Sequence, residues 1–168
     1  MKRVETFLIL LVLSGIAAVF LPSVSHGLEG GNAGFADVRK AGSRVDVEVL
    51  DTTGKKVSFR SFIGGKPLVV VFWATWCPLC RDEVPTLNRL AADPAIRVLG
   101  VNVGENEQKV RTFITSNHVG YPVVRDPGWQ TTAAYQVLGL PAFLILDEEG
   151  QVLYRGSIVP GNIEDYLR

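Results

Sequence analysis

The sequence predicts an α/β sandwich whose central sheet is mixed, with strands that alternate with helices along most of the chain. Two observations lead to this prediction. Short apolar runs typical of buried strands recur between segments with helical periodicity, and the last two strand-like runs are joined by a tight turn, which predicts a terminal hairpin. The 168 residues are enough for one domain with a short appendage. Basic and acidic residues number 17 each, so the composition gives no indication of a nucleic-acid partner.

Residues 1–25 have the pattern of a signal peptide or a membrane anchor. Lys2 and Arg3 precede an apolar run over 7–21, and small residues follow that run before His26. A helix over 7–21 would span only ~23 Å, less than the ~30 Å hydrocarbon core of a bilayer, which favours a cleaved signal over a retained single span. In both cases we expect the rest of the chain outside the cytoplasm, in the periplasm or at the outer face of the cytoplasmic membrane.

After this leader we expect a flexible tether over 26–42, because several glycines lie there, and a folded domain over 43–168. We expect the membrane to be contacted only through the N-terminal segment.

The domain begins with alternating apolar and acidic residues over 45–50, a turn, and a return strand over 56–59, which together predict a hairpin. The first central strand follows over 68–74.

A helix is predicted from Cys77 onward, because apolar residues recur along one stripe as far as Ala91. Pro85 lies inside this helix and should bend it, since a proline ring displaces the carbonyl four residues back. The remaining elements, in chain order, are a strand over 96–103, a helix over 109–117, a strand over 121–124, a helix over 131–137 capped by Gly139, strands over 142–146 and 152–155, and a final helix over 162–167.

The two cysteines of the chain, Cys77 and Cys80, lie directly after the strand predicted over 68–74. A strand that leads into Cys-x-x-Cys and then into a helix indicates a redox dithiol at a helix N-terminus. The alternative is a structural disulfide. A bridge between residues three apart closes almost no loop and therefore gains little entropy, so we favour the redox dithiol.

The segment 72–85, Phe-Trp-Ala-Thr-Trp-Cys-Pro-Leu-Cys-Arg-Asp-Glu-Val-Pro, resembles the active-site segment of the TlpA/ResA/CcmG group of thioredoxin-like proteins. The resemblance continues through 65–67, 101–105 and 139–147, in the order that the family has them, and covers roughly the part from Asp46 to the C-terminus. It implies a thioredoxin-like three-layer sandwich with an added N-terminal β-hairpin.

The same resemblance implies a thiol–disulfide oxidoreductase that works outside the cytoplasm. It would reduce disulfides in exported proteins, for example the haem-binding cysteines of apocytochrome c during cytochrome c maturation. Its partners would be protein disulfides or dithiols, and a membrane electron donor would re-reduce it. We expect no cofactor other than the redox-active disulfide of Cys77 and Cys80, and no metal.

Cys77 is predicted to be the attacking thiol, because unpaired amides at a helix start favour the thiolate, which is the reactive form. Cys80 would then resolve the mixed disulfide, and we expect it to be the more buried of the two. Pro78 lies between them, is expected to tune the reduction potential and is a candidate for substrate binding. Trp76 either contacts substrate at the rim of the site or packs into the core.

Leu140 and Pro141 match the position at which thioredoxin-like folds carry a cis-proline beside the dithiol. The resemblance therefore implies a cis bond here, and the cis form is accessible before proline. We expect the backbone of Leu140 to face outward, where an extended substrate segment can pair with it. An ordinary trans turn proline is the alternative.

Two glutamates are candidates for a role beside the dithiol. Glu83 follows Cys80 by one helical turn and so projects to the same side. The family has a glutamate there and another that matches Glu105. Such a carboxylate can accept or return the proton that disulfide exchange moves, whereas the alternative for both is a solvated glutamate. Cytoplasmic thioredoxins have a buried aspartate where this chain has Val71, which favours the proton-transfer role of Glu83.

Two other functions remain as alternatives. A thiol peroxidase would have a threonine a few positions before its reactive cysteine, and Thr75 lies at the wrong spacing from Cys77. A copper-delivery protein on the same fold typically has Cys-x-x-x-Cys and a distant histidine, and this chain has one residue fewer between its cysteines and offers only His118.

Overall fold

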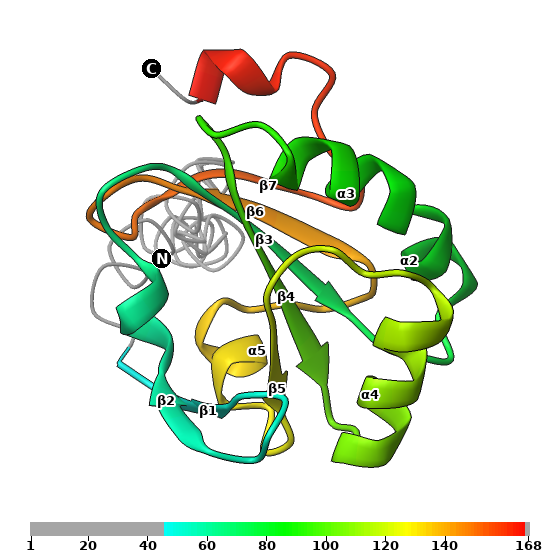
Figure 1. The fold of residues 1–168 in the computed structure, drawn as a ribbon. Coiled ribbons are helices and arrows are strands. Elements are labelled where there is room, and N and C mark those ends of the chain that lie inside the picture. Colours follow the sequence, from blue (N-terminus) through cyan, green and yellow to red (C-terminus); the bar gives the residue numbers. More distant parts are fainter. Residues whose placement is uncertain (1–45, 167–168) are drawn as a thin grey trace, which may run out of the picture. The chain divides into compact units, whose positions relative to one another are not determined.

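A seven-stranded mixed sheet in the order β2-β1-β5-β4-β3-β6-β7 forms the centre of the computed structural model, which describes residues 46–166 (Figure 1). Its strands are β1 (Glu48–Leu50), β2 (Lys56–Ser58), β3 (Leu68–Trp73), β4 (Arg97–Val103), β5 (Val123–Asp126), β6 (Ala142–Leu146) and β7 (Val152–Gly156). The helical elements are η1 (Phe59–Phe62), α2 (Pro78–Asp82), α3 (Val84–Ala91), α4 (Glu107–Ser116), α5 (Gln130–Ala134) and η2 (Ile163–Tyr166).

The leader predicted over 1–25 and the tether predicted over 26–42 lie outside the described residues. Within residues 46–166, no helix has both the length and the apolar character needed to cross a membrane. The N-terminal hairpin is confirmed, since β1 and β2 pair antiparallel. The fold class predicted from the sequence is confirmed as well: an α/β domain with a mixed sheet.

The three central strands set the position of the site. β3, β4 and β5 run parallel, and β6 runs antiparallel to β3, so the carboxyl ends of the three parallel strands and the start of β6 meet at one edge of the sheet. In the β3–β6 ladder, Phe72 is opposite Ala142. The end of β7 lies at the same edge, because Gly156 is opposite Phe143. In α/β folds, the loops at such an edge are where functional groups gather.

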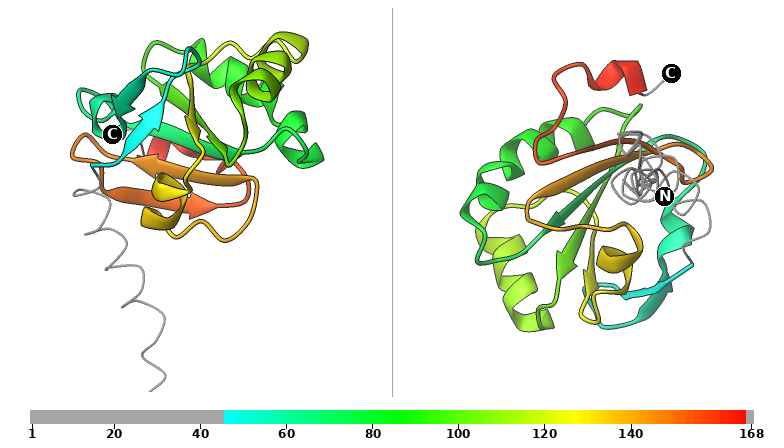
Figure 2. Two further views of the ribbon diagram at one scale, coloured as in Figure 1. Left: turned by 90° about the horizontal axis from the view of Figure 1, so that it is seen from below. Right: turned by 180° about the vertical axis from the view of Figure 1, so that it is seen from behind.

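Both faces of the sheet are covered, which explains why its central strands are apolar at nearly every position. Val69, Val71 and Trp73 of β3 point into the core cluster shared with α3 and α4. The intervening residues Val70 and Phe72 point into a second cluster on the other face, which includes residues of η1 and the tyrosine that ends α5. Figure 2 shows α3 and α4 on one side of the sheet and α5 on the other.

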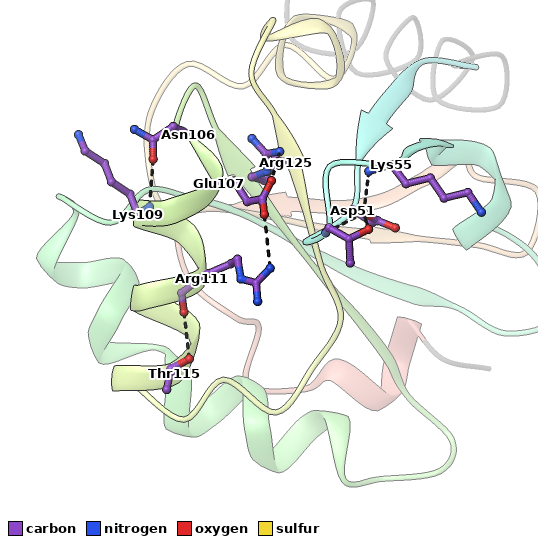
Figure 3. Close-up of polar contacts among 9 residues, drawn as sticks. Asp51, Lys55, Asn106, Glu107, Lys109, Arg111, Thr115 and Arg125 are labelled. Carbon is purple, nitrogen blue, oxygen red and sulfur yellow. Dashed lines mark hydrogen bonds and ion pairs between the residues drawn. The ribbon is translucent and has the colours of Figure 1, made fainter.

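Polar side chains fix the beginning of α4 and join it to β5 (Figure 3). The Asn106 side chain accepts a hydrogen bond from the Lys109 amide at 3.0 Å, so it caps the helix. Glu107 then pairs with Arg111 at 3.4 Å and with Arg125 at 3.6 Å. Arg125 is buried, and this ion pair compensates its charge.

The predicted helix that begins at Cys77 is two helices rather than one bent helix. α2 ends at Asp82, Glu83 joins the two, and α3 begins at Val84. Pro85 has no N–H to donate to the carbonyl of Arg81, so the continuous ladder is lost at this point and the chain starts a second helix instead.

The structure also corrects two predictions in the second half of the chain. The helix predicted over 131–137 ends at Ala134, because Gln136 has a left-handed backbone with φ 50° and interrupts the helix before Gly139. The C-terminal helix is a 3₁₀-helix at Ile163–Tyr166.

Candidate active site

β3 leads through a tight turn into the two cysteines. The Cys77 amide donates to the Ala74 carbonyl at 3.2 Å, which closes a turn with Thr75 and Trp76 in the middle. Cys77 then takes the N-cap position of α2 with an extended backbone, and Pro78 follows as the first helical residue, where its missing N–H has no consequence. Cys77 and Cys80 are joined by a disulfide, with their Cα atoms 5.3 Å apart.

A backbone amide contacts one of the two sulfurs. The Cys80 amide lies 3.2 Å from Sγ of Cys77 and donates to it. α2 has only five residues, so its macrodipole is small and this local N–H is the more important influence on the sulfur. A donor at this position favours the thiolate of Cys77 once the disulfide is reduced.

The two cysteines are buried to the same degree. Cys77 and Cys80 are each 4% exposed, and both pack into the apolar cluster that contains Trp73 and Val84. The prediction that Cys80 is the more buried is therefore wrong for the oxidised form, because the disulfide holds both sulfurs against the same cluster. The feature that distinguishes Cys77 is its amide donor and not its exposure.

Apolar side chains surround this buried disulfide at the surface. Trp76 is 68% exposed and Leu79 is 64% exposed, and Pro78 between them in sequence is also exposed. Trp76 is therefore a surface residue, and of the two interpretations of its sequence position, core packing is wrong. Exposed aromatic and aliphatic groups of this kind are typical of contact surfaces for other proteins.

The Leu140–Pro141 peptide bond is cis, as the family resemblance implied. Since Phe72 is opposite Ala142 in the β3–β6 ladder, Pro141 lies alongside the end of β3, close to the turn that leads to Cys77. Leu140 is half-buried and packs against the cluster that holds both cysteines. The structure thus brings Leu140 and Pro141 to the dithiol, and their role in substrate binding stays a prediction.

Glu105 is a buried residue that binds the turn before Cys77. Its carboxylate accepts hydrogen bonds from the Thr75 amide at 2.7 Å, from the Thr75 hydroxyl at 2.6 Å and from the Asn102 side-chain amide at 2.8 Å. Glu105 is 9% exposed, so the alternative of a solvated glutamate is wrong. Glu105 thus contacts, through Thr75, the turn over Ala74–Cys77 that leads into the dithiol, which we call the redox turn.

Gly104 brings Glu105 into this position. Its φ of 72° is in the left-handed region, and a Cβ atom there would lie 2.9 Å from the indole of Trp129. The Gly104 amide also donates to the carbonyl of Asp126, so the end of β4 turns sharply against the end of β5.

Glu83 has a different environment from Glu105. It is half-buried at the junction of α2 and α3, and its side chain forms no hydrogen bond or ion pair with another described residue. Because the helix is interrupted at Glu83, the spacing rule for a continuous helix does not fix the direction of its side chain. Its part in proton transfer stays a prediction.

Sequence reasoning missed Thr75 and Asn102 as partners of Glu105. Asn102 carried a usable signal, because a polar residue between Val101 and Val103 in a buried strand requires a hydrogen-bond partner. No comparable signal marked Thr75. Among residues 46–166, no three or more side chains of His, Cys, Asp or Glu are grouped to hold a metal ion.

Comparisons with known proteins agree with this geometry. The model of the AhpC/TSA family matches residues 42–155. Thiol-disulfide oxidoreductase ResA of Bacillus subtilis is 30% identical over 166 residues, covering 94% of this chain and 91% of the Bacillus protein. Thiol:disulfide interchange protein DsbE of Escherichia coli is 31% identical over 176 residues, covering all of this chain and 94% of the Escherichia protein.

Among solved structures, a secreted disulfide oxidoreductase of Mycobacterium tuberculosis that is homologous to E. coli DsbE superposes with a TM-score of 0.61 at 26% identity. The match covers 69% of this chain and 86% of the mycobacterial chain. The architecture described above is therefore thioredoxin-like, as the sequence resemblance implied.

Proposed function

Since this chain belongs to the AhpC/TSA family and is a thiol–disulfide oxidoreductase, we propose that it works outside the cytoplasm and reduces disulfides in exported proteins, apocytochrome c among them. The observation that carries the chemistry is the Cys80 amide, which donates to the sulfur of Cys77 at the buried disulfide. The reducing direction rests on the resemblance to the TlpA/ResA/CcmG group.

The reaction takes place in two exchange steps. The Cys77 thiolate attacks one sulfur of the substrate disulfide, the substrate S–S bond breaks, and its second sulfur leaves as a thiolate that takes up a proton. Cys80 then loses its proton and attacks Sγ of Cys77, which breaks the mixed disulfide and releases the second substrate thiol. Two electrons have passed from the dithiol to the substrate, and the Cys77–Cys80 disulfide remains.

Glu83 is the proposed acceptor for the proton that Cys80 loses. It is half-buried, lies three residues after Cys80, and has no other described partner to compete for its carboxylate. Glu105 has no such freedom, because its carboxylate already accepts three hydrogen bonds. We therefore assign proton transfer to Glu83 and positioning of the redox turn to Glu105.

Substrate is proposed to lie over Trp76 and Pro78 and along Leu140 and Pro141. The first two form an exposed apolar rim, and the last two lie at the start of β6 beside the end of β3. An extended substrate segment at this place would pair its backbone with that of Leu140. No cofactor enters either step.

Each turnover leaves the enzyme oxidised, so a reductant outside the cytoplasm needs a supply of electrons. We assign this supply to a membrane dithiol donor, and the segment 1–25 to export or anchoring. A membrane-impermeant maleimide applied to intact cells tests the compartment. It should label the Cys77 thiol after mild reduction, and protection until the cells are lysed would contradict the assignment.

The order of attack is tested by trapping. The Cys80→Ser variant should accumulate a covalent mixed disulfide with protein substrates, because the second exchange step is blocked, and Cys77→Ser is the matched control. Trapping by Cys77→Ser alone would reverse the two roles. Turnover of hydrogen peroxide that exceeds turnover of protein disulfides would favour the thiol peroxidase instead.

A further inference from the structure

A groove of about 500 Å³ runs beside the proposed substrate site, in the range typical of ligand sites. One wall is the segment 136–142, between α5 and β6, and the other is formed by residues 155–157 at the end of β7. We call it the Arg155 groove. Much of its lining is apolar, and Leu138 in it is fully exposed. An apolar side chain held in solvent beside a hollow surface indicates a contact site.

The two walls are held together by Arg155 itself. Its Nη1 donates to the carbonyl of Gln136 at 2.9 Å, across from β7 to the other wall. Within β7, the Tyr154 hydroxyl donates to the carbonyl of Ile158, two residues after the end of the strand, at 2.9 Å. Gly156 makes this bond possible, because a Cβ atom there would lie 2.1 Å from the Tyr154 hydroxyl. The bond from Arg155 to Gln136 therefore fixes the two walls of the groove against each other.

The charge of Arg155 is not compensated within the described residues. Arg155 forms no ion pair with a carboxylate of residues 46–166. Burial also lowers the pKa of this guanidinium. Arg125 shows the contrast, since it is paired with Glu107 (Figure 3). Removing a cation from water costs free energy when no anion is beside it. A carboxylate from another molecule that binds Arg155 would offset this cost.

The groove is continuous with the dithiol site. Leu140 and Pro141 belong to its lining, and the same two residues lie beside the end of β3. A polypeptide whose cysteine reaches Cys77 past Pro141 would continue into the groove with the residues next to that cysteine. These neighbouring residues of the substrate meet an apolar surface and one unpaired arginine.

We propose that the Arg155 groove binds the stretch of substrate polypeptide next to its reacting cysteine and selects for an acidic side chain among apolar ones. The inference rests on the proposed function, because it places the substrate cysteine at Cys77. The carboxylate binds Arg155, and the apolar neighbours pack on Leu138 and Leu140. The substrate class is thus proteins with an acidic residue close to the disulfide that is reduced.

Pairs of peptide disulfides that differ only in glutamate or glutamine, at successive positions on either side of the cysteine, test this selection. With the full protein, kcat/KM should be about tenfold higher for the glutamate peptide at the best position, the fold-change of one charge-assisted hydrogen bond. Arg155→Gln should abolish the preference. Arg97→Gln is the matched control. Arg97 also donates to a backbone carbonyl, that of Gly64, but it lies at the start of β4, at the opposite edge of the sheet from the dithiol. This variant should keep the preference for the glutamate peptide.

The outcomes separate the two proposals. Equal kcat/KM for both peptides at every position, with good turnover, overturns the groove assignment and leaves the proposed function intact. No turnover of either peptide overturns the proposed function. An equal loss on both peptides in Arg155→Gln, with an unchanged ratio, shows that Arg155 only clamps the two walls. Arg155→Lys, which keeps the charge, should retain part of the preference.

Discussion

The two sides of the dithiol differ in whether their charged side chains have partners. On the side of β4 and β5, the buried Glu105 carboxylate accepts three hydrogen bonds and fixes Thr75 in the turn before Cys77. On the side of β6 and β7, the guanidinium of Arg155 has no carboxylate partner among the described residues, and Leu138 is fully exposed. A carboxylate that accepts three hydrogen bonds holds the turn before Cys77 in place, whereas an arginine without an anion can take a carboxylate from another molecule.

This difference predicts that substitutions on the first side lower stability and activity toward all disulfides. Substitutions on the second side should change the choice of substrate and lower stability less. Four substitutions test this contrast, in order of decreasing effect on stability.

Glu105→Gln should have the largest effect on stability. The glutamine amide has one acceptor oxygen in place of two, so the bond from the Thr75 hydroxyl is lost or reversed, and the remaining bonds are no longer made to a charged group. We expect the free energy of unfolding to fall by about 2 kcal/mol. Urea unfolding monitored by tryptophan fluorescence measures it. Glu83→Gln is the control and should change this free energy by less than about 0.5 kcal/mol, because no described residue pairs with Glu83. Equal effects of the two variants would contradict the contrast.

Gly104→Ala should come next on the same side. A left-handed backbone disfavours any residue with a Cβ atom, and here that atom would also meet the Trp129 indole at 2.9 Å. We expect a loss of about 1.5 kcal/mol in the free energy of unfolding and slower reduction of every disulfide tested. Gly139→Ala is suited as a control, since a Cβ atom there meets nothing within 4 Å. A variant as stable as the wild type would show that the turn is not fixed by Gly104.

Gly156→Ala tests the second side. The new Cβ atom would displace the Tyr154 hydroxyl from the Ile158 carbonyl, which is a change at the tip of a flexible side chain. We expect a loss of about 1 kcal/mol in unfolding free energy, together with a weaker preference for acidic peptides. Tyr154→Phe removes the same hydrogen bond without the added atom. If it preserves the preference while Gly156→Ala loses it, the shape of the groove is the determinant.

Trp76→Ala should change stability least, by less than about 0.5 kcal/mol, because the side chain is 68% exposed. Its expected effect is on substrate: a KM for protein disulfides roughly fivefold higher, with unchanged reduction of a small aromatic disulfide. Steady-state kinetics with both substrates give the answer. A loss with the small disulfide as well would place Trp76 in the reaction itself and not in recognition.

Much of this site follows from local sequence. The strand predicted over 68–74, the disulfide between Cys77 and Cys80 and the cis bond before Pro141 were all predicted from short motifs, because each depends on neighbours in the chain or on a family pattern. The break at Glu83 was predicted only as a bend. A helix can accommodate a proline by bending or by restarting, and packing around it decides between the two.

The interactions that were not predicted join distant parts of the chain. Thr75 and Glu105 are thirty positions apart, and they meet because β3 and β4 are parallel neighbours with a particular register. The equal burial of the cysteines depends on the cluster around Trp73. Arg155 looked like an ordinary strand residue, since nothing in the sequence shows whether an arginine has a partner. Local sequence patterns identify the reactive residues. The residues that position them can be identified only once the fold is known.

The most direct test of this description is the rate at which Cys77 is alkylated by iodoacetamide, measured against pH in the reduced Cys80→Ser variant. The amide of residue 80 is still present in this variant, so the thiolate of Cys77 should persist into more acidic solution than that of free cysteine. The rate should therefore reach half its maximum at a lower pH than for a cysteine-containing peptide. A curve that coincides with the peptide's would contradict the assignment of Cys77 as the activated nucleophile.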